Sequence, residues 1–222
     1  MARECKNIIV CLLISFTLPL VFLGGCLWAD QEKFSVEGDT LIYNSNWAAN
    51  PLENFIMEDD VQNFIDLLKR DDIRTIRLTS PGGERAASID IADIIMSKKL
   101  NTEASGNCLS GCTRLFIAGK KRTLLPEAKL GFHSHSFHFE DFESTVQFAD
   151  EYFKELDFEN TLSYLERLMA VHDIKFYHLQ GISLFFSLKV MTIHPHDAWY
   201  PTREELEKHG VLRRSYNFEG VK

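Results

Sequence analysis

The apolar positions of this chain follow two different periods. Between Asp59 and Arg70 they recur every three or four residues, which is typical of an amphipathic helix. Short β-branched stretches such as Thr75–Thr79, which ends at Ser80-Pro81-Gly82-Gly83, indicate buried strands instead. Applied along the chain, the two periods predict helices at 59–70, 84–97, 115–119 and 143–171, and strands at 33–36, 41–43, 75–79, 101–105 and 129–133.

The order of these elements predicts the fold class. Strands and helices alternate, and this arrangement favours an α/β fold with mostly parallel strand pairing. No internal repeat, low-complexity tract or Pro/Gly/Ser-rich linker follows residue 30 of the sequence. We therefore expect a single domain over residues 30–222.

Composition and charge narrow the functional class. The 222 residues are 45% hydrophobic and 25% charged, which is ordinary for a globular protein and excludes a wholly disordered chain. The formal net charge is −8, with 24 Lys and Arg against 32 Asp and Glu. Proteins that bind nucleic acid through its phosphates are usually basic. We therefore expect no nucleic-acid partner.

The N-terminal segment has the layout of a secretory signal. Two basic residues, Arg3 and Lys6, precede an uncharged run from Ile8 to Gly25. Leu23-Gly24-Gly25-Cys26 resembles a bacterial lipobox, so residues 1–26 are predicted to be a signal peptide and Cys26 the lipidated residue. An uncleaved membrane anchor and ordinary signal cleavage are the alternatives, since the run is near the minimum length of a transmembrane helix. Each alternative exports residues 30–222, and we expect a membrane-tethered lipoprotein of the bacterial periplasm.

Two cysteines, Cys108 and Cys112, lie in the part that we expect to be exported. An even pair in an oxidising compartment invites a disulfide. A spacing of four residues allows the bond only where a turn or helix start brings the two Cα atoms within about 7 Å. The alternative is a pair of small buried hydrophobic side chains.

Three features are candidates for catalytic chemistry. Ser110 lies between small residues at a predicted strand-to-helix junction, where backbone N–H groups favour developing negative charge. His133 follows a predicted strand, and a neutral imidazole close to a serine hydroxyl is what a general base requires. The paired glycines of Ser80-Pro81-Gly82-Gly83 leave backbone N–H groups open to a ligand oxygen. An N-cap serine and a tight turn are the ordinary structural explanations.

A metal site is the alternative use of the histidines. His135 and His138 follow His133 closely, but no nearby acidic residue completes a known zinc pattern. We therefore expect neither a metal ion nor a cofactor.

Four short motifs occur in a specific order. Leu78-Thr79-Ser80-Pro81-Gly82-Gly83 is followed by Cys108-Leu109-Ser110-Gly111-Cys112-Thr113, then by Phe116-Ile117-Ala118-Gly119 and Gly131-Phe132-His133. Together they resemble the Clp protease proteolytic subunit of the Clp protease/crotonase superfamily, and in particular its exported bacterial branch. The resemblance covers about residues 70–135 and returns around 196–211. It implies the repeated β-β-α superhelix of that superfamily.

The resemblance also implies roles for individual residues. Ser110 matches the nucleophile, His133 matches the general base, and the backbone N–H groups of Gly83 and Gly111 match the oxyanion hole. Asp197 is the nearest candidate for the acid of the triad, although its spacing to the following helix and glycine differs from that of the proteolytic subunit. Such an acid mainly fixes the imidazole tautomer and stabilises the imidazolium.

The activity implied by the resemblance is that of an exported, ATP-independent serine peptidase acting on a peptide or protein substrate. A homo-oligomer is also implied, with the segments Phe137–Phe158 and Leu184-Phe185-Phe186 as candidate interfaces. A crotonase-type reaction on a coenzyme A thioester is disfavoured, because no basic cluster for a nucleotide phosphate is evident. Export would also separate the protein from coenzyme A substrates. The alternative from another class is a catalytically inactive binding or scaffold protein of the cell envelope.

Overall fold

The computed structural model describes residues 32–48, 50, 53–134 and 158–212. The chain divides into a unit of residues 1–30 and a unit of residues 31–222, and all described residues belong to the second. The predicted signal segment 1–26, with Cys26, lies outside the described residues. Among the helices that are described, none combines the length and the apolar character needed to cross a bilayer.

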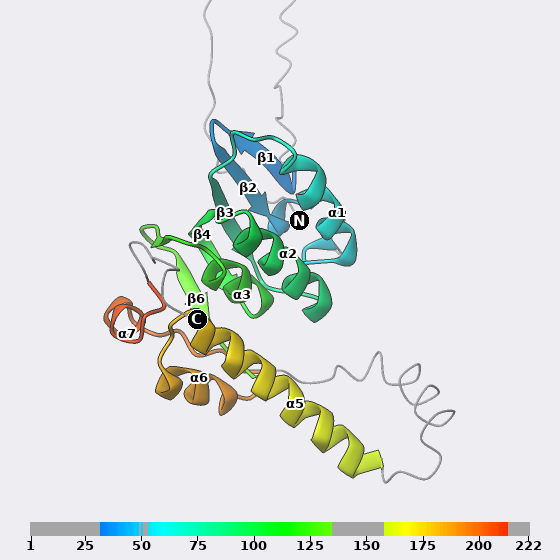
Figure 1. Cartoon of the computed structure of the whole chain (residues 1–222), viewed down its shortest axis with the longest axis vertical. Coiled ribbons are helices and arrows are strands. Elements are labelled where there is room, and N and C mark those ends of the chain that lie inside the picture. Colours follow the sequence, from blue (N-terminus) through cyan, green and yellow to red (C-terminus); the bar gives the residue numbers. More distant parts are fainter. Residues whose placement is uncertain (1–31, 49, 51–52, 135–157, 213–222) are drawn as a thin grey trace, which may run out of the picture. The chain divides into compact units, whose positions relative to one another are not determined.

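The described residues form a six-stranded sheet whose first four strands lie side by side in chain order (Figure 1). The edge strand β1 (Phe34–Glu37) pairs antiparallel with β2 (Thr40–Asn44). From β2 the pairing is parallel, first with β3 (Thr75–Ser80) and then with β4 (Asn101–Leu109).

The long strand β4 carries two short parallel partners. Its first part pairs with β5 (Arg122–Leu124), and its last part pairs with β6 (Lys129–Gly131). This second pairing brings the chain that follows β6 to the carboxyl end of β4. The α/β fold with a mostly parallel sheet is confirmed.

Helices connect the parallel strands and cover the sheet. After β2 come the short 3-10 helix η1 (Ser45–Trp47) and α1 (Glu58–Leu67), and α2 (Arg85–Ser97) joins β3 to β4. The next helix, α3 (Gly111–Ile117), begins directly after β4 and packs against α2 (Figure 1).

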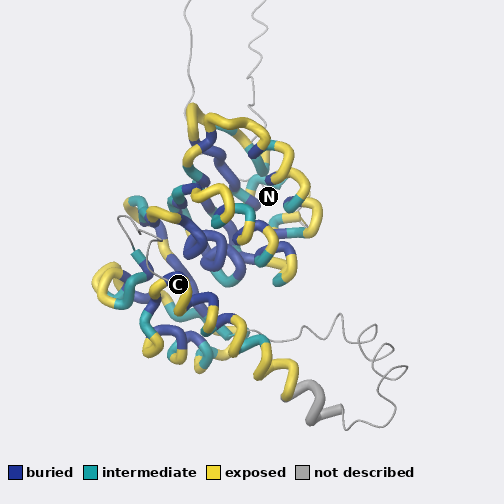
Figure 2. The backbone as a smooth tube through the Cα atoms, viewed as in Figure 1, coloured by how far each residue is buried: buried dark blue, intermediate teal, exposed yellow. Residues whose placement is uncertain are grey.

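Three further helices follow β6: α5 (Phe158–Leu179), α6 (Leu184–Met191) and α7 (Arg203–Lys208). The first two of these pack against each other. The side chains of Tyr164 to Leu168 in α5 are all exposed, whereas its last turns are partly buried (Figure 2).

The core consists of apolar side chains from the strands and from α1 to α3, joined by apolar side chains of α5, α6 and α7. Its burial is expected from the two periods of the sequence, because strand residues alternate inward and helix residues recur on one face. Members that are fully buried include Leu41, Ile76, Leu78, Ile91, Ile95 and Phe116.

The C-terminal helices are tied to the sheet through a buried arginine. Arg122 of β5 is 4% exposed and donates to the carbonyl of Gly119, to both oxygens of Gln180 and to the carbonyl of Val211. Carbonyl and amide oxygens from three separate segments therefore converge on one guanidinium.

Several element boundaries differ from the predicted ones. The strand predicted over 101–105 continues to Leu109, and the helix predicted over 115–119 begins already at Gly111. Both differences have one cause. The small and polar residues between 105 and 114 do not show the pattern of a strand or a helix start, and pairing with β6 stabilises this part of the chain. The helix predicted over 143–171 was wrong at its C-terminal end, because α5 continues to Leu179. Its part from 143 to 157 lies outside the described residues.

Candidate active site

Ser110 is the single residue between β4 and α3, and its backbone conformation is unusual. It has φ 51° and ψ −123°. For a residue with a side chain, such a conformation costs about 1–3 kcal/mol and persists only where the surroundings fix it. Here the Ser110 N–H donates to the Gly131 carbonyl at 3.0 Å, and the Ser110 carbonyl accepts from the N–H and the hydroxyl of Thr113 at 2.9 and 2.6 Å.

A disulfide encloses this junction. It joins Cys108 at the end of β4 to Cys112 in the first turn of α3, with a Cα–Cα distance of 5.2 Å. Both cysteines are fully buried. The helix start at Gly111 is what brings residues four positions apart within reach of each other. Ser110 therefore sits at the tip of a covalently closed turn.

Two buried serines support the Gly82-Gly83 turn that follows β3. The hydroxyl oxygen of Ser80 accepts from the Gly82 N–H at 3.1 Å and contacts the Ser45 hydroxyl at 2.8 Å. Both serines are fully buried. The sequence assigned neither hydroxyl a supporting role, because a side chain that orients a turn leaves no periodic signal.

The N–H group of Gly83 points away from Ile56, the residue with which Gly83 pairs. Ile56 and Gly83 form a parallel bridge, in which the Ile56 N–H donates to Gly82 at 2.7 Å and the Glu84 N–H donates to Ile56 at 2.8 Å. In this pattern the N–H of the central residue points to the opposite side. No acceptor for it is present within the described residues. Gly83 itself is exposed, so a ligand can reach this N–H.

Gly111 offers a second N–H group beside Ser110. It is the first residue of α3, and such a residue has no acceptor within its own helix. A Cβ atom at this position would lie 2.3 Å from the Ser88 hydroxyl oxygen, so only glycine fits here unless the Ser88 side chain moves.

His133 is positioned by pairing between two distant segments. The preceding residue, Phe132, forms an antiparallel bridge with Trp199. The imidazole is half-buried, with Nδ1 2.7 Å from the carbonyl oxygen of Ser134. A carbonyl can only accept, so Nδ1 carries the proton and Nε2 holds the free lone pair. Nε2 is therefore the basic atom of this side chain.

The four residues Gly83, Ser110, Gly111 and His133 line one small cavity of about 20 Å³. This volume is enough for roughly one water molecule or a group of similar size. No hydrogen bond joins the Ser110 hydroxyl to His133 in the part of the chain that the structure describes. Catalytic hydrogen bonds are often long in unliganded sites and shorten when substrate binds.

Asp197 is not brought to this cavity. It is exposed, and its N–H donates to the His194 carbonyl at 2.9 Å in a turn of the segment that precedes α7. Neither an ion pair nor a hydrogen bond links its carboxylate to His133 within the described residues. Two of the histidines considered as metal ligands, His135 and His138, lie outside those residues.

A cluster of charges forms the inner wall of the cavity, and the sequence did not predict it. The guanidinium groups of Arg85 and Arg114, which line the cavity, both bind the same carboxylate oxygen of Asp173, at 3.1 and 2.8 Å. The Arg114 guanidinium also stacks on the Phe176 ring at 4.1 Å. The one available signal was the position of Arg114 within an otherwise apolar helix.

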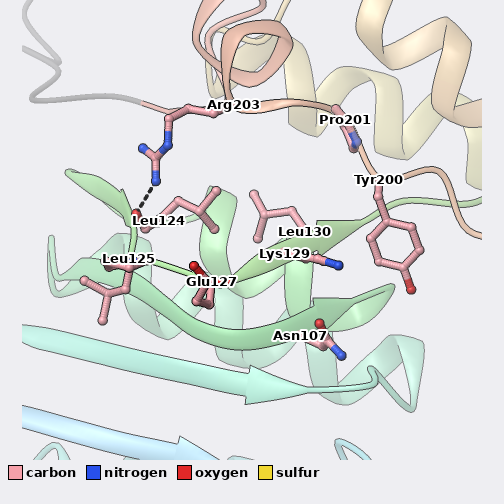
Figure 3. Close-up of a pocket in the computed structure, with 11 residues that line it drawn as sticks. Asn107, Leu124, Leu125, Glu127, Lys129, Leu130, Tyr200, Pro201 and Arg203 are labelled. Carbon is pink, nitrogen blue, oxygen red and sulfur yellow. Dashed lines mark hydrogen bonds between the residues drawn. The ribbon is translucent and has the colours of Figure 1, made fainter.

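A larger cavity, of about 620 Å³, lies away from Ser110. It is bounded by residues 124–130 and by the segment Tyr200–Arg203, where the Arg203 guanidinium donates to the Leu124 carbonyl at 2.6 Å (Figure 3). No serine, cysteine or histidine lines it. Despite its size, it lacks the nucleophile and base that the smaller cavity brings together.

Solved structures that align with this chain include ClpP1 and a membrane-bound protease. ClpP1 from Listeria monocytogenes aligns with a TM-score of 0.51 and 15% identity, over 71% of this chain and 84% of that one. A point mutant of that protein gives a TM-score of 0.49, also at 15% identity over 71% and 84% of the two chains. A mutant of a membrane-bound stomatin-specific protease gives 0.47 at 15% identity, over 71% of this chain and 73% of that one.

The likeness to ClpP1 shows the fold of this chain. It is a Clp-protease-like α/β fold, as the motifs between residues 78 and 133 predicted. No family model and no curated protein matches the sequence.

Proposed function

We propose that this protein is a serine hydrolase, and specifically a peptidase, with Ser110 as nucleophile and His133 as general base. One observation carries the proposal. Ser110 is held at positive φ on a strand-to-helix turn, in one cavity with an imidazole and two glycines that offer N–H groups. Strained backbone of this kind is characteristic of nucleophile turns in hydrolases.

The proposed reaction follows from the atoms that line the cavity. Nε2 of His133 takes the proton of the Ser110 hydroxyl while Oγ attacks the carbonyl carbon of the substrate. The N–H groups of Gly83 and Gly111 donate to the oxyanion that forms, and each such donor contributes about 3–4 kcal/mol in comparable sites. His133 then gives its proton to the departing amine nitrogen. Water hydrolyses the acyl-enzyme by the same route in reverse.

Labelling of the full chain with a fluorophosphonate probe tests the proposal. We expect wild-type protein to be labelled and both Ser110→Ala and His133→Ala to lose labelling, because only an activated serine reacts. Ser97→Ala is the matched control: it removes an exposed serine hydroxyl, which donates to the Ile94 carbonyl at 2.9 Å far along α2, and should label like wild type. Folded wild-type protein that stays unlabelled would favour the non-catalytic scaffold.

A second prediction concerns the third member of the triad. The Ser134 carbonyl already accepts from Nδ1 of His133, so the imidazole is oriented without a carboxylate. We therefore expect Asp197→Asn to lower kcat by less than about tenfold, far below the roughly 10⁴-fold loss found where a triad acid is essential. Peptide hydrolysis at saturating substrate measures this. A loss near 10⁴-fold would mean that Asp197 moves onto His133 when substrate binds.

We also propose that the chain is exported, tethered through Cys26 and assembled as a homo-oligomer. Export and lipidation are supported by the basic and apolar N-terminal pattern and its lipobox-like end. Assembly is supported by apolar side chains that face solvent. In the candidate segment of α6, Leu184 and Phe185 are 57% and 68% exposed, while Phe186 is fully buried in the core. Exposed apolar clusters of this kind mark interaction surfaces. The other candidate segment lies outside the described residues except for Phe158.

A further inference from the structure

The charge cluster beside Ser110 carries more positive than negative charge. Arg85 and Arg114 share a single carboxylate, that of Asp173, which is 1% exposed. Counted over the described residues, one positive charge is therefore left over at the wall of the cavity. His172, whose Nδ1 lies 3.4 Å from Arg85 and 3.6 Å from Asp173, adds to it when protonated.

The two guanidinium groups also have hydrogen-bonding capacity to spare. The Nε atoms of Arg85 and Arg114 are both buried and have no hydrogen-bond partner among the described residues. Arg114 as a whole is only 8% exposed. A buried donor without an acceptor costs free energy, so a ligand that supplies an acceptor gains from this site.

The rest of the wall contains nothing that would compete with an anion. The residues lining the cavity include no Asp or Glu. Tyr177 stays neutral, because burial and the nearby charge of Asp173 raise the pKa of its hydroxyl. Burial lowers the pKa of Arg114, and the neighbouring carboxylate of Asp173 opposes this shift. Thr113 and Ser88 also line the cavity, but their hydroxyl groups already donate to the carbonyls of Ser110 and Glu84.

We propose that the part of the cavity lined by Arg85 and Arg114 is a specificity pocket. It selects substrates that carry an aspartate side chain on the residue whose carbonyl is attacked. The inference rests on the proposed function, because Ser110 and the two glycine N–H groups line the same cavity. A substrate carbonyl placed on them would bring its own side chain to the cavity that Arg85 and Arg114 also line. The cavity of about 20 Å³ excludes a large apolar side chain.

Hydrolysis of matched peptides by the full chain tests the pocket. The peptides differ only at the residue before the cleaved bond, which is Asp, the isosteric Asn, Leu or Lys. We expect kcat/KM to be at least about tenfold higher for Asp than for Asn, as charge-assisted hydrogen bonds are the stronger ones. The variant is Arg85→Gln, since the Arg85 side chain is 28% exposed and less embedded than that of Arg114. It should bring the ratio close to one, because Arg114 and Asp173 then neutralise each other.

A charge control and a binding measurement complete the test. Lys98→Gln removes an exposed positive charge at the far end of α2 and should leave the Asp-to-Asn ratio unchanged. Calorimetry with Ser110→Ala, which needs no catalysis, should show the Asp peptide binding several-fold tighter than the matched Asn peptide.

Each result has a definite reading. Equal binding of Asp and Asn peptides, a ratio unaffected by Arg85→Gln, or a preference for Lys would overturn the pocket while leaving a labelled Ser110 intact. Selective binding of Asp peptides by a protein that the fluorophosphonate probe does not label would contradict the proposed peptidase activity and support the anion-selective pocket.

Discussion

Replacing Asp173 by Asn is expected to lower the free energy of unfolding by about 3–5 kcal/mol, the usual cost of removing one partner from a buried ion pair. Arg85 and Arg114 both bind this carboxylate, and Arg114 is itself nearly buried. Asn keeps the shape of the side chain but removes the charge, so two guanidinium groups would repel each other without a counter-ion. The loss should appear as a lower urea midpoint with an unchanged slope.

Glu166 provides the matched control for this variant. It lies on the same helix, α5, and is exposed, so Glu166→Gln removes an equal charge without burying an unpaired one. Such a surface change should alter stability by less than about 0.5 kcal/mol. If the two variants lost the same small amount, Asp173 would not be the electrostatic anchor between α5, α2 and α3.

The position of Ser110 could be predicted because its determinants are local. Small residues around it, two cysteines four positions apart and a preceding strand all lie within a dozen positions. The exact junction could not be predicted, since the last part of β4 pairs with β6 and, at Cys108, with β3. Both pairings bring together segments more than twenty positions apart in the sequence. Local propensity predicts the strand β4, whereas pairing with strands distant in the sequence determines where it ends.

The charge cluster beside Ser110 could not be predicted from the sequence for a related reason. Arg85, Arg114 and Asp173 come from three different helices, and the bond between Arg114 and Asp173 spans 59 positions. Ion pairs have no period that a sequence displays, unlike apolar faces. His133 illustrates the same limit: its motif predicted a base, but the orientation of the ring depends on the Ser134 carbonyl.

Replacing Gly83 by Ala is expected to lower kcat for peptide hydrolysis by about 10²–10³-fold, the effect of losing one oxyanion donor. Gly83 has φ 154°, and a Cβ atom there would lie 2.2 Å from the Ile56 carbonyl oxygen and 2.4 Å from the Ile56 nitrogen. Backbone atoms cannot rotate away as a flexible side chain can. The turn must therefore shift, and its N–H group shifts with it.

Gly38→Ala separates this effect from the general cost of alanine at positive φ. Gly38 has φ 59° with nothing within 4 Å of an added Cβ, in the turn between β1 and β2. Its replacement should cost about 1 kcal/mol of stability and leave kcat unchanged. Circular dichroism and urea unfolding must first show that Gly83→Ala is folded, after which kcat at saturating substrate gives the result. A folded Gly83→Ala variant with kcat within about threefold of wild type would exclude the Gly83 N–H as an oxyanion donor, because no displaced donor stabilises a transition state as well as an aligned one.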